Sequence, residues 1–369
     1  MKKINFITSN LAPYRAEWCE ELSKYYDVKI IYTKDSDFER DDRWLVNRSD
    51  KCELIKLNNV FNNKRNPLCF DVIKYLNQKN TIYIFDGYGP VTNLIGMIYL
   101  GIKKNKFYVN VDGWQKGTKE PKINKLIKKC IFKIDFKFLC SSVNTKAYLK
   151  EYGVSDERMI VHNFSSIRES RIENKKDLFL AKKYAKEKLG IKGKNVIAVG
   201  RFIKLKRFED LLYAKSKSQE NYGLYIIGGM PTEEYLKIID EYKLKDVHFV
   251  DLILDKRILD LYYLACDIFV LPTSTDVWGL VVNEAMAKGL PIISTTNCVS
   301  GFDLIEVGKN GYRIEVGDIE SLSNYIDELI NNDKKRIEFG YRSLEIIKNY
   351  TIENMVKIHK KEFDSCCKE

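Results

Sequence analysis

The chain alternates short apolar runs with segments whose apolar residues recur at helical spacing. An apolar run at residues 4–10 precedes a helical pattern at 14–26, and another run at 81–87 precedes a helical pattern near 91–101. Such alternation is typical of βαβ units and parallel sheets. We therefore predict an α/β protein of Rossmann-like, doubly wound sheets, with ligands outside the carboxyl ends of the strands.

Two series of such units are separated by a polar, highly charged stretch at residues 165–185. A length of 369 residues also suits two domains. We predict an N-terminal domain over 1–170, a C-terminal domain over 171–342 and a helical C-terminal segment over 343–369. The expected strands lie at 4–10, 27–33, 81–87, 106–113, 136–142 and 159–164, then at 195–201, 222–229, 246–253, 266–272, 291–295 and 311–316.

The composition is that of a folded protein, 45% hydrophobic and 31% charged. The first ten residues contain polar side chains where a signal peptide would be apolar, and the apolar stretch at 94–102 is too short to span a bilayer. Nine cysteines are scattered and form no Cys-x-x-Cys pair, which favours thiols in a reducing compartment. These features predict a cytoplasmic protein.

The net charge of +11 is concentrated in the N-terminal half. Residues 103–137 include eleven lysines and three acids, and within them residues 122–137 combine lysines with apolar residues at helical spacing. This basic amphipathic helix fits a solvated surface or the anionic headgroups of a membrane. Nucleic acid is the weaker explanation, because no nucleic-acid motif accompanies the charge. We expect an anionic membrane surface as partner and no nucleic acid.

The stretch TDVWGLVVNEAMAKGLPIIST, residues 275–295, places two carboxylates eight positions apart. Asp276 lies in a loop after an apolar strand, and Glu284 lies within the helix that follows. Their separation is on the order of 10 Å, which suits the two ends of an elongated ligand better than a contacting acid/base pair. Between them the backbone N–H groups at the helix start could bind an anion such as a diphosphate. A capping Asp and a helix-surface Glu explain the same spacing.

Two further strand ends carry candidate chemistry. After the strand that ends at Gly200, Arg201 and Lys206 offer two cations that suit phosphate oxygens, although a basic surface loop gives the same pattern. The second strand end, Ile-Ile-Gly-Gly at 226–229, leaves room at Gly228 for close backbone approach.

From residue 199 to about 322 the chain resembles the family 4 retaining glycosyltransferases of GT-B fold. The matching pieces are VGRFIKLK, YIIGG, VHFVD, DIFVLPTSTDVWGLVVNEAMAKGLPIIST and VGKNGY, in the family's order and spacing. The N-terminal half is similar more loosely, through LAPYRAEWCEELSKYYDV and KAYLKEYGVSDERMIVHNF. The resemblance implies two Rossmann-like domains facing a cleft, a nucleotide-sugar donor in the C-terminal one, and a last helix that packs back on the first domain.

The resemblance also implies roles for individual residues. Arg201 and Lys206 would hold the donor diphosphate, and Glu284 would bind the ribose hydroxyls. Asp276 stands at the place of the family's first glutamate, which contacts the donor sugar, and is shorter by one methylene. The remaining donor-binding positions are Gly200, Gly228, Gly279, Leu280 and Val281 in the C-terminal half and Arg15 in the N-terminal half.

The N-terminal half departs from the family at two places. Its first βα loop has SNLAPYR where many members have a Gly-Gly pair, so Arg15 would supply a cation there. The strand that often ends in a histidine near the reacting sugar here ends in Val-Asp-Gly-Trp, which makes Asp112 the candidate acceptor-orienting group or base. An ordinary Asp-Gly turn explains Asp112 equally well.

The implied reaction transfers a sugar, with retention, from a UDP-, GDP- or dTDP-linked donor to a hydroxyl of a glycan acceptor, expected to be lipid-linked. We predict a hexosyl- or deoxyhexosyltransferase of capsule or surface polysaccharide assembly, peripheral at the inner face of the cell membrane. It would need no metal or other cofactor, since Asp35 and Asp37 provide the chain's only DxD and lie in an early polar loop. Another GT-B enzyme, such as a nucleotide-sugar epimerase or phosphorylase, is the alternative.

Overall fold

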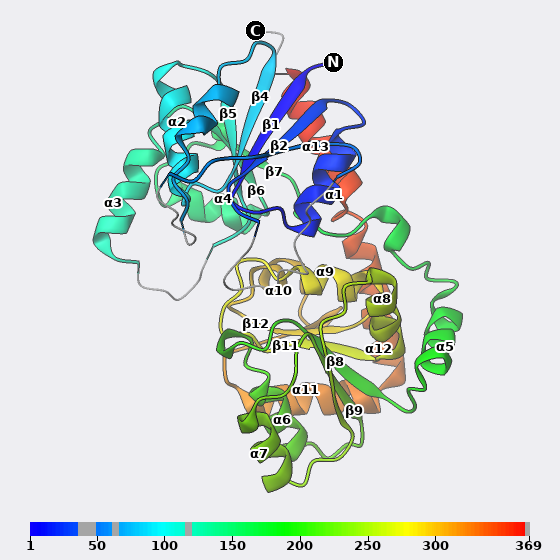
Figure 1. Ribbon diagram of the computed structural model, residues 1–369. Helices are drawn as coiled ribbons and strands as arrows, with labels where there is room; N and C mark the ends of the chain where they lie inside the picture. The colour runs from blue at the N-terminus through cyan, green and yellow to red at the C-terminus, as the bar shows by residue number, and fades with distance from the viewer. Residues whose placement is uncertain (36–48, 61–65, 115–119, 366–369) are drawn as a thin grey trace. The chain divides into compact units, whose positions relative to one another are not determined.

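The computed structural model describes residues 1–35, 49–60, 66–114 and 120–365 (Figure 1). These residues divide into two compact units. Unit 1 holds the described residues up to Ser166 together with those from Thr351, and unit 2 holds Ile167–Tyr350. Residue 343, where we expected the C-terminal segment to begin, lies inside the helix α12 of unit 2.

Unit 1 is built on a seven-stranded parallel sheet in the order β3-β2-β1-β4-β5-β6-β7. The central strands are apolar on both faces, and all five residues of β5 are buried, as expected for a parallel sheet covered by helices. Only β3 was not among the predicted strands. The strands are β1 Lys3–Thr8, β2 Asp27–Tyr32, β3 Glu53–Lys56, β4 Thr81–Asp86, β5 Phe107–Val111, β6 Lys137–Cys140 and β7 Met159–Val161.

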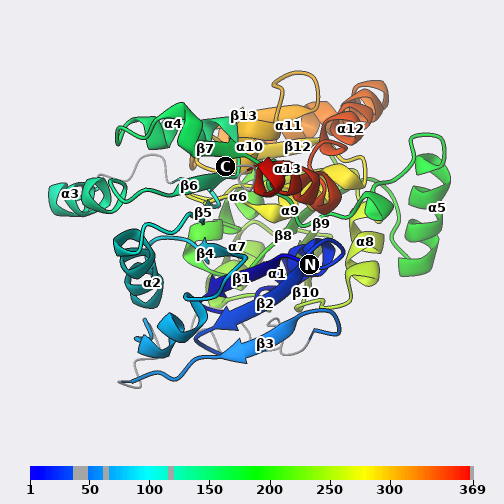
Figure 2. The ribbon, with the colours of Figure 1, turned by 90° about the horizontal axis from the view of Figure 1, so that it is seen from above.

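The helices of unit 1 cover both faces of this sheet, with α1 and α13 packed together on one face and α2 on the other (Figure 2). Because side chains alternate along a strand, Phe85 and Val109 join the core under α2, while Asp86 and Asn110 belong to the α1 face. The helices are α1 Pro13–Leu22, α2 Val91–Ile102, α3 Lys122–Ile131, α4 Val143–Lys150 and α13 Ile352–Ser365.

A buried chain of aromatic hydrogen bonds attaches α13 to the rest of unit 1. The indole Nε1 of Trp18 donates to Nδ1 of His359 at 3.1 Å, and Nε2 of His359 lies 2.8 Å from Nδ1 of His162. Since an indole can only donate, His359 must carry its proton on Nε2 and donate to His162. Burial lowers the pKa of His359 to about 3 and that of His162 well below its usual range. Both imidazoles are therefore neutral.

Unit 2 is built on a six-stranded parallel sheet in the order β10-β9-β8-β11-β12-β13. As in unit 1, the first strand of the unit has the second and third strands on one side and the fourth strand on the other. The strand order therefore reverses beside the first strand, β8. The strands are β8 Asn195–Val199, β9 Gly223–Ile227, β10 Val247–Val250, β11 Ile268–Leu271, β12 Ile292–Thr295 and β13 Gly311–Ile314. The helices are α5 Leu178–Leu189, α6 Glu209–Lys217, α7 Glu233–Glu241, α8 Lys256–Ala265, α9 Leu280–Ala287, α10 Val299–Leu304, α11 Ile319–Asn331 and α12 Asp333–Ile347.

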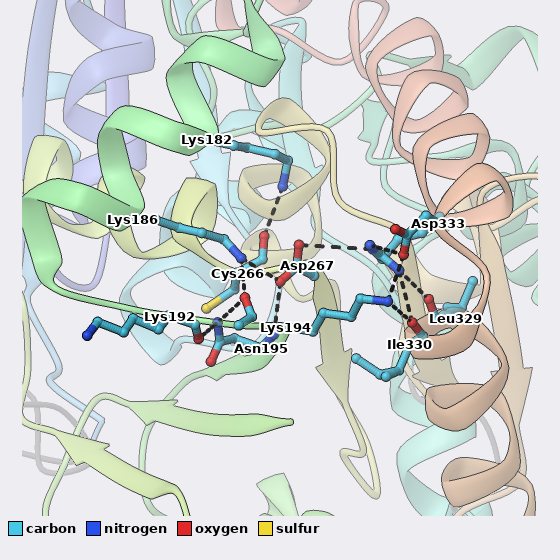
Figure 3. A network of polar contacts seen from close by, with 12 residues as sticks. Lys182, Lys186, Lys192, Lys194, Asn195, Cys266, Asp267, Leu329, Ile330 and Asp333 are labelled. Atoms are coloured by element: carbon cyan, nitrogen blue, oxygen red, sulfur yellow. Dashed lines mark hydrogen bonds and ion pairs between the residues drawn. The ribbon is translucent and has the colours of Figure 1, made fainter. Parts of the chain in front are cut away.

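The stretch predicted to be a linker contains most of α5, which packs on α8 and is fastened to the amino edge of the unit 2 sheet (Figure 3). Lys182 donates to the carbonyl of Cys266 at 2.9 Å, and Lys186 pairs with Asp267 at 3.0 Å. Asp267 also accepts from the backbone N–H of Asn195 at 2.9 Å. Lys182 of the charged stretch and Lys186 just beyond it therefore hold α5 in place.

The neutral histidine pair predicts that unit 1 loses stability in mild acid. Both histidines have folded-state pKa values below the unfolded value near 6.5, so their contribution is complete above that pH and is lost as the pH falls toward 3. Between pH 6.5 and 5 the free energy of unfolding should fall by about 1.4 kcal/mol per pH unit for each histidine. Urea unfolding at a series of pH values measures this slope.

Two variants distinguish the contribution of the His162–His359 pair to this slope from the contributions of other titrating groups. His359→Phe removes one of the two protons taken up on unfolding and should halve the slope over that range. His248→Gln replaces an exposed histidine outside the pair and controls for the loss of a histidine as such. A free energy of unfolding that is constant from pH 6.5 to 5 would contradict the neutral pair.

Candidate functional site

The carboxyl edge of the unit 2 sheet brings together the strand ends predicted to carry chemistry. Gly200 follows β8 and Gly228 follows the neighbouring β9, and the N–H of Gly200 donates to the carbonyl of Ile227 at 2.9 Å. A Cβ added at Gly228, where φ is +122°, would lie 2.3 Å from the carbonyl oxygen of Gly200. Only glycine at 228 lets the two loops approach so closely.

The loop that contains Arg201 and Lys206 is joined to the loop after β11. The N–H of Ser274 donates to the carbonyl of Leu205 at 2.8 Å, and the hydroxyl of Thr273 donates to the same oxygen at 2.8 Å. This brings Nζ of Lys206 into contact with Oδ2 of Asp276, with both side chains mostly buried. Two residues predicted to hold one donor thus meet, although they lie 70 positions apart.

Residues 277–279 lead from Asp276 to the start of α9. Gly279 takes φ +91°, and a Cβ there would lie 2.9 Å from Sγ of Cys298. Leu280 begins the helix, and the first N–H groups of a helix have no partner within it. The predicted anion position is formed by Gly279, Leu280 and Val281. It follows Asp276, the partner of Lys206, by three residues in the chain.

Glu284 lies one turn into α9 and is held by a neighbouring helix. The hydroxyl of Tyr263, a fully buried residue of α8, donates to Oε2 of Glu284 at 3.1 Å. Burial raises the pKa of the Glu284 carboxyl, and the charges of Arg171 and Lys256 with the Tyr263 hydroxyl lower it only in part. The carboxylate is thus poorly solvated, and hydrogen-bond donors on a ligand would stabilise it.

A buried ion-pair cluster aligns α8 with α9. Nζ of Lys288, only 4% exposed, lies 3.1 Å from Asp260 and 2.9 Å from Glu173, and donates to the carbonyl of Arg171 at 2.7 Å. The guanidinium of Arg171 grips Asp260 through two nitrogens, at 2.6 and 3.2 Å. Sequence spacing gave no sign of these contacts, which join residues 28 to 117 positions apart.

Unit 1 has its own polar cluster at the carboxyl edge of its sheet. Arg15, 1% exposed in the first turn of α1, places Nη2 2.6 Å from Oδ1 of Asp86 and in contact with Oδ1 of Asp112. Thr8, the last residue of β1, donates to the other oxygen of Asp86 at 2.9 Å. Burial alone would lower the pKa of Arg15, but the charges of Asp112 and Asp86 raise it overall, so the guanidinium stays charged.

Sequence reasoning found Arg15 and Asp112 but missed Asp86. Asp-Gly ends β4 at 86–87 just as Asp-Gly follows β5 at 112–113, and the two strands are parallel neighbours. Asp86 and Asp112 share one guanidinium, so the cluster has a net charge of −1 and two partly exposed carboxylates. Hydroxyl groups are suitable ligands for such carboxylates, whereas an anion would be repelled.

The remaining predicted positions are placed as follows. Arg201 is partly buried in the loop after β8. Asp37 of the DxD sequence lies outside the described residues, and Asp35 pairs with Lys56. Among residues 1–35, 49–60, 66–114 and 120–365, no group of three His, Cys, Asp or Glu side chains is arranged to hold a metal ion.

The predicted basic helix exists over a shorter range, as α3, and none of its residues is buried. Three apolar side chains, Ile123, Leu126 and Ile127, are 50–61% exposed. Lys128 anchors the helix, since its Nζ lies 2.7 Å from Glu120 and donates to the hydroxyl of Tyr148 at 2.9 Å. No helix in the described part of the chain is long and apolar enough to cross a membrane.

Lys288 provides a direct test of the cluster that aligns α8 and α9. Replacing it with Ala removes the cation that lies between Asp260 and Glu173 and leaves Asp260 with Arg171 alone, so the free energy of unfolding should fall by about 3 kcal/mol. Lys309→Ala is the matched control, because Lys309 is 71% exposed and its ion pair should contribute no more than about 1 kcal/mol. Equal losses for the two variants in urea unfolding would refute the assignment.

Comparison with solved structures defines the class of the protein. Sucrose-phosphate synthase from Thermosynechococcus elongatus superposes with a TM-score of 0.77, at 18% identity over 99% of each chain. Anabaena Alr3699/HepE in complex with UDP also gives 0.77, at 16% identity over 98% of this chain and 100% of that one. Together with the two parallel sheets, these likenesses confirm the predicted GT-B fold.

A family model matches most of the second unit. Residues 181–345 match the family model described as glycosyl transferases group 1, so the predicted resemblance to that group is confirmed for this GT-B protein. Membership of family 4 stays a prediction.

Curated relatives match over part of their length. An uncharacterized glycosyltransferase of Haemophilus influenzae is 32% identical over 173 residues, 45% of this chain and 48% of that protein. The capsular polysaccharide biosynthesis glycosyltransferase CapM of Staphylococcus aureus is 31% identical over 157 residues, 41% of this chain and 40% of CapM. The match thus spans about half or less of each of these relatives.

Proposed function

We propose that the protein is a retaining glycosyltransferase that moves a hexosyl or deoxyhexosyl group from a nucleotide diphosphate sugar to a hydroxyl of a glycan acceptor. One observation carries the proposal: several groups suited to a nucleotide sugar lie near one edge of the unit 2 sheet. They are Lys206, Asp276, the start of α9 and the carboxylate of Glu284. The match of this unit to glycosyl transferases group 1 supports it, as does the complex of Anabaena Alr3699/HepE with UDP.

In this proposal the leaving diphosphate lies against the start of α9. Arg201, Lys206 and the N–H groups of residues 279–281 stabilise the charge that develops as the sugar–phosphate bond breaks. Protein cations carry this role, so the proposed reaction uses neither a metal ion nor another cofactor. Asp276 contacts the donor sugar, and its pairing with Lys206 keeps that cation beside the phosphate position before the donor binds.

The acceptor hydroxyl is assigned to unit 1. Asp112 accepts its proton or orients it, and Arg15 serves the acceptor cluster by fixing Asp112 beside Asp86. A capsule or other surface polysaccharide is the proposed product class, which the name of CapM supports. The proposed site of action is the inner face of the cell membrane, reached from the cytoplasm.

Lys206→Ala tests the diphosphate assignment. Losing a charge that stabilises the leaving group should lower kcat/KM for the donor by about 10- to 100-fold. The readout is nucleotide released from UDP-, GDP- and dTDP-sugars by the full chain. Lys204→Ala is the control, since Lys204 is exposed on the same loop and should keep wild-type kinetics. Wild-type kinetics in both Lys206→Ala and Arg201→Ala would reject the assignment.

The exposed face of α3 is proposed to lie on anionic lipid, which would bring the enzyme to a lipid-linked acceptor. Its lysines supply attraction to headgroups, and its exposed apolar residues supply insertion.

Vesicle sedimentation tests this contact. The protein should bind vesicles that contain phosphatidylglycerol, bind less as salt rises, and leave phosphatidylcholine vesicles unbound. Leu126→Glu should weaken binding about 10-fold or more through lost apolar burial. Ile337→Glu, at an equally exposed site in unit 2, should not. Equal binding to neutral and anionic vesicles would count against an electrostatic contact.

A further inference from the structure

Helices α8 and α9 are joined by two side-chain contacts one helical turn apart. Asp260 of α8 lies 3.1 Å from Lys288, the residue that caps the end of α9. Tyr263, three residues after Asp260, donates to Glu284, four residues before Lys288. The first contact is a buried ion pair that Arg171 and Glu173 complete. It fixes the relative position of the helices, so the Tyr263 hydroxyl and the Glu284 carboxylate face each other in one register.

The Tyr263 hydroxyl is suited to orient a carboxylate rather than to react. Its side chain is fully buried, and burial followed by the charge of Glu284 raises its pKa well above the usual range, so it remains a donor. By holding Oε2, it fixes the plane of the carboxylate and thereby the directions of the remaining lone pairs. A freely rotating glutamate would lose side-chain entropy on binding a ligand, and this one has already lost it.

Resting on the proposed function, we infer that Tyr263 is a positioning residue that makes the donor site selective for ribonucleoside over deoxyribonucleoside diphosphates. A carboxylate held in one orientation accepts hydrogen bonds from the 2′- and 3′-hydroxyls of a ribose together. A deoxyribose removes one of these donors, so the carboxylate makes one hydrogen bond fewer to the ligand. UDP-, GDP- and ADP-sugars thus become the donor class, and dTDP-sugars are disfavoured.

The expected effects follow from the strength of hydrogen bonds to a charged group. Loss of one such bond lowers affinity by about 10- to 100-fold. The wild-type protein should therefore bind UDP at least about 10-fold more tightly than 2′-deoxy-UDP, and 2′,3′-dideoxy-UDP more weakly still. If the donor nucleotide carries guanine or adenine, GDP or ADP and their deoxy and dideoxy forms should bind in the same order of affinity.

Titration calorimetry on the full chain tests the inference with Tyr263→Phe, which removes only the hydroxyl. The variant should bind UDP about 10-fold more weakly but bind 2′,3′-dideoxy-UDP within about twofold of wild type, because the dideoxy ligand has no hydroxyl for Glu284. Tyr262→Phe, on the same helix, should change neither affinity. Glu284→Gln should reduce the preference for ribose as Tyr263→Phe does.

The outcomes separate this inference from the proposed function. If Tyr263→Phe, with an unchanged melting temperature, weakens UDP and the dideoxy ligand equally, Tyr263 has only a structural role and the inference is overturned. Wild-type protein that binds UDP and 2′-deoxy-UDP equally overturns it while the donor site stands. Failure of UDP, GDP and ADP all to bind overturns the proposed function, and the inference with it.

Discussion

All the polar groups assigned to the proposed reaction depend on one constraint, the gathering of parallel strand ends at a single edge of a sheet. Parallel strands direct every carboxyl end the same way, so loops far apart in the sequence become neighbours. In unit 2 this brings Lys206 to Asp276, and in unit 1 it brings Arg15 to Asp86 and Asp112. The central strands are largely apolar and buried, and apart from their last residues they supply position rather than chemistry.

Buried charges at these edges are paired with nearby groups of opposite charge. The groups that remain available after this pairing determine what each cluster can bind. Arg15 is enclosed by two carboxylates, so the unit 1 cluster offers hydrogen-bond acceptors to a ligand. The start of α9 offers N–H donors beside Lys206, which suits an anion. Glu284 is compensated only in part and becomes an acceptor for hydroxyl donors. The three clusters therefore suit three chemically different portions of the proposed substrates.

Apolar runs predicted twelve of the thirteen strands in the described part of the chain, because a buried parallel strand is marked by its own composition. The short β3, Glu53–Lys56, has no such mark, since none of its residues is buried. The charged stretch at residues 165–185 was predicted as a domain boundary or linker because its lysines look solvated in sequence, whereas Lys182 is anchored to the carbonyl of Cys266 and its residues from Leu178 belong to α5. Local charge alone could not distinguish the two cases.

Site residues on loops after strands could be found from the sequence, since a strand end followed by Gly, Asp or Arg is a local signal. Asp86 had the same signal, an Asp-Gly pair at a strand end, and was missed. Tyr263, Asp260 and Lys288 had none, because their function depends on how two helices align. Cross-helix contacts of this kind are a property of packing, and sequence spacing within one helix does not encode them.

The proposed reaction requires a nucleoside diphosphate on the start of α9 in unit 2. Hydrogen–deuterium exchange of the full chain with and without UDP, GDP or ADP measures this at the backbone. We expect slower exchange for the amides of Gly279, Leu280 and Val281 and for the loop from Gly200 to Lys206 with at least one nucleotide. Protection confined to other segments, with these amides unchanged in the presence of a nucleotide that binds, would contradict the proposed donor site.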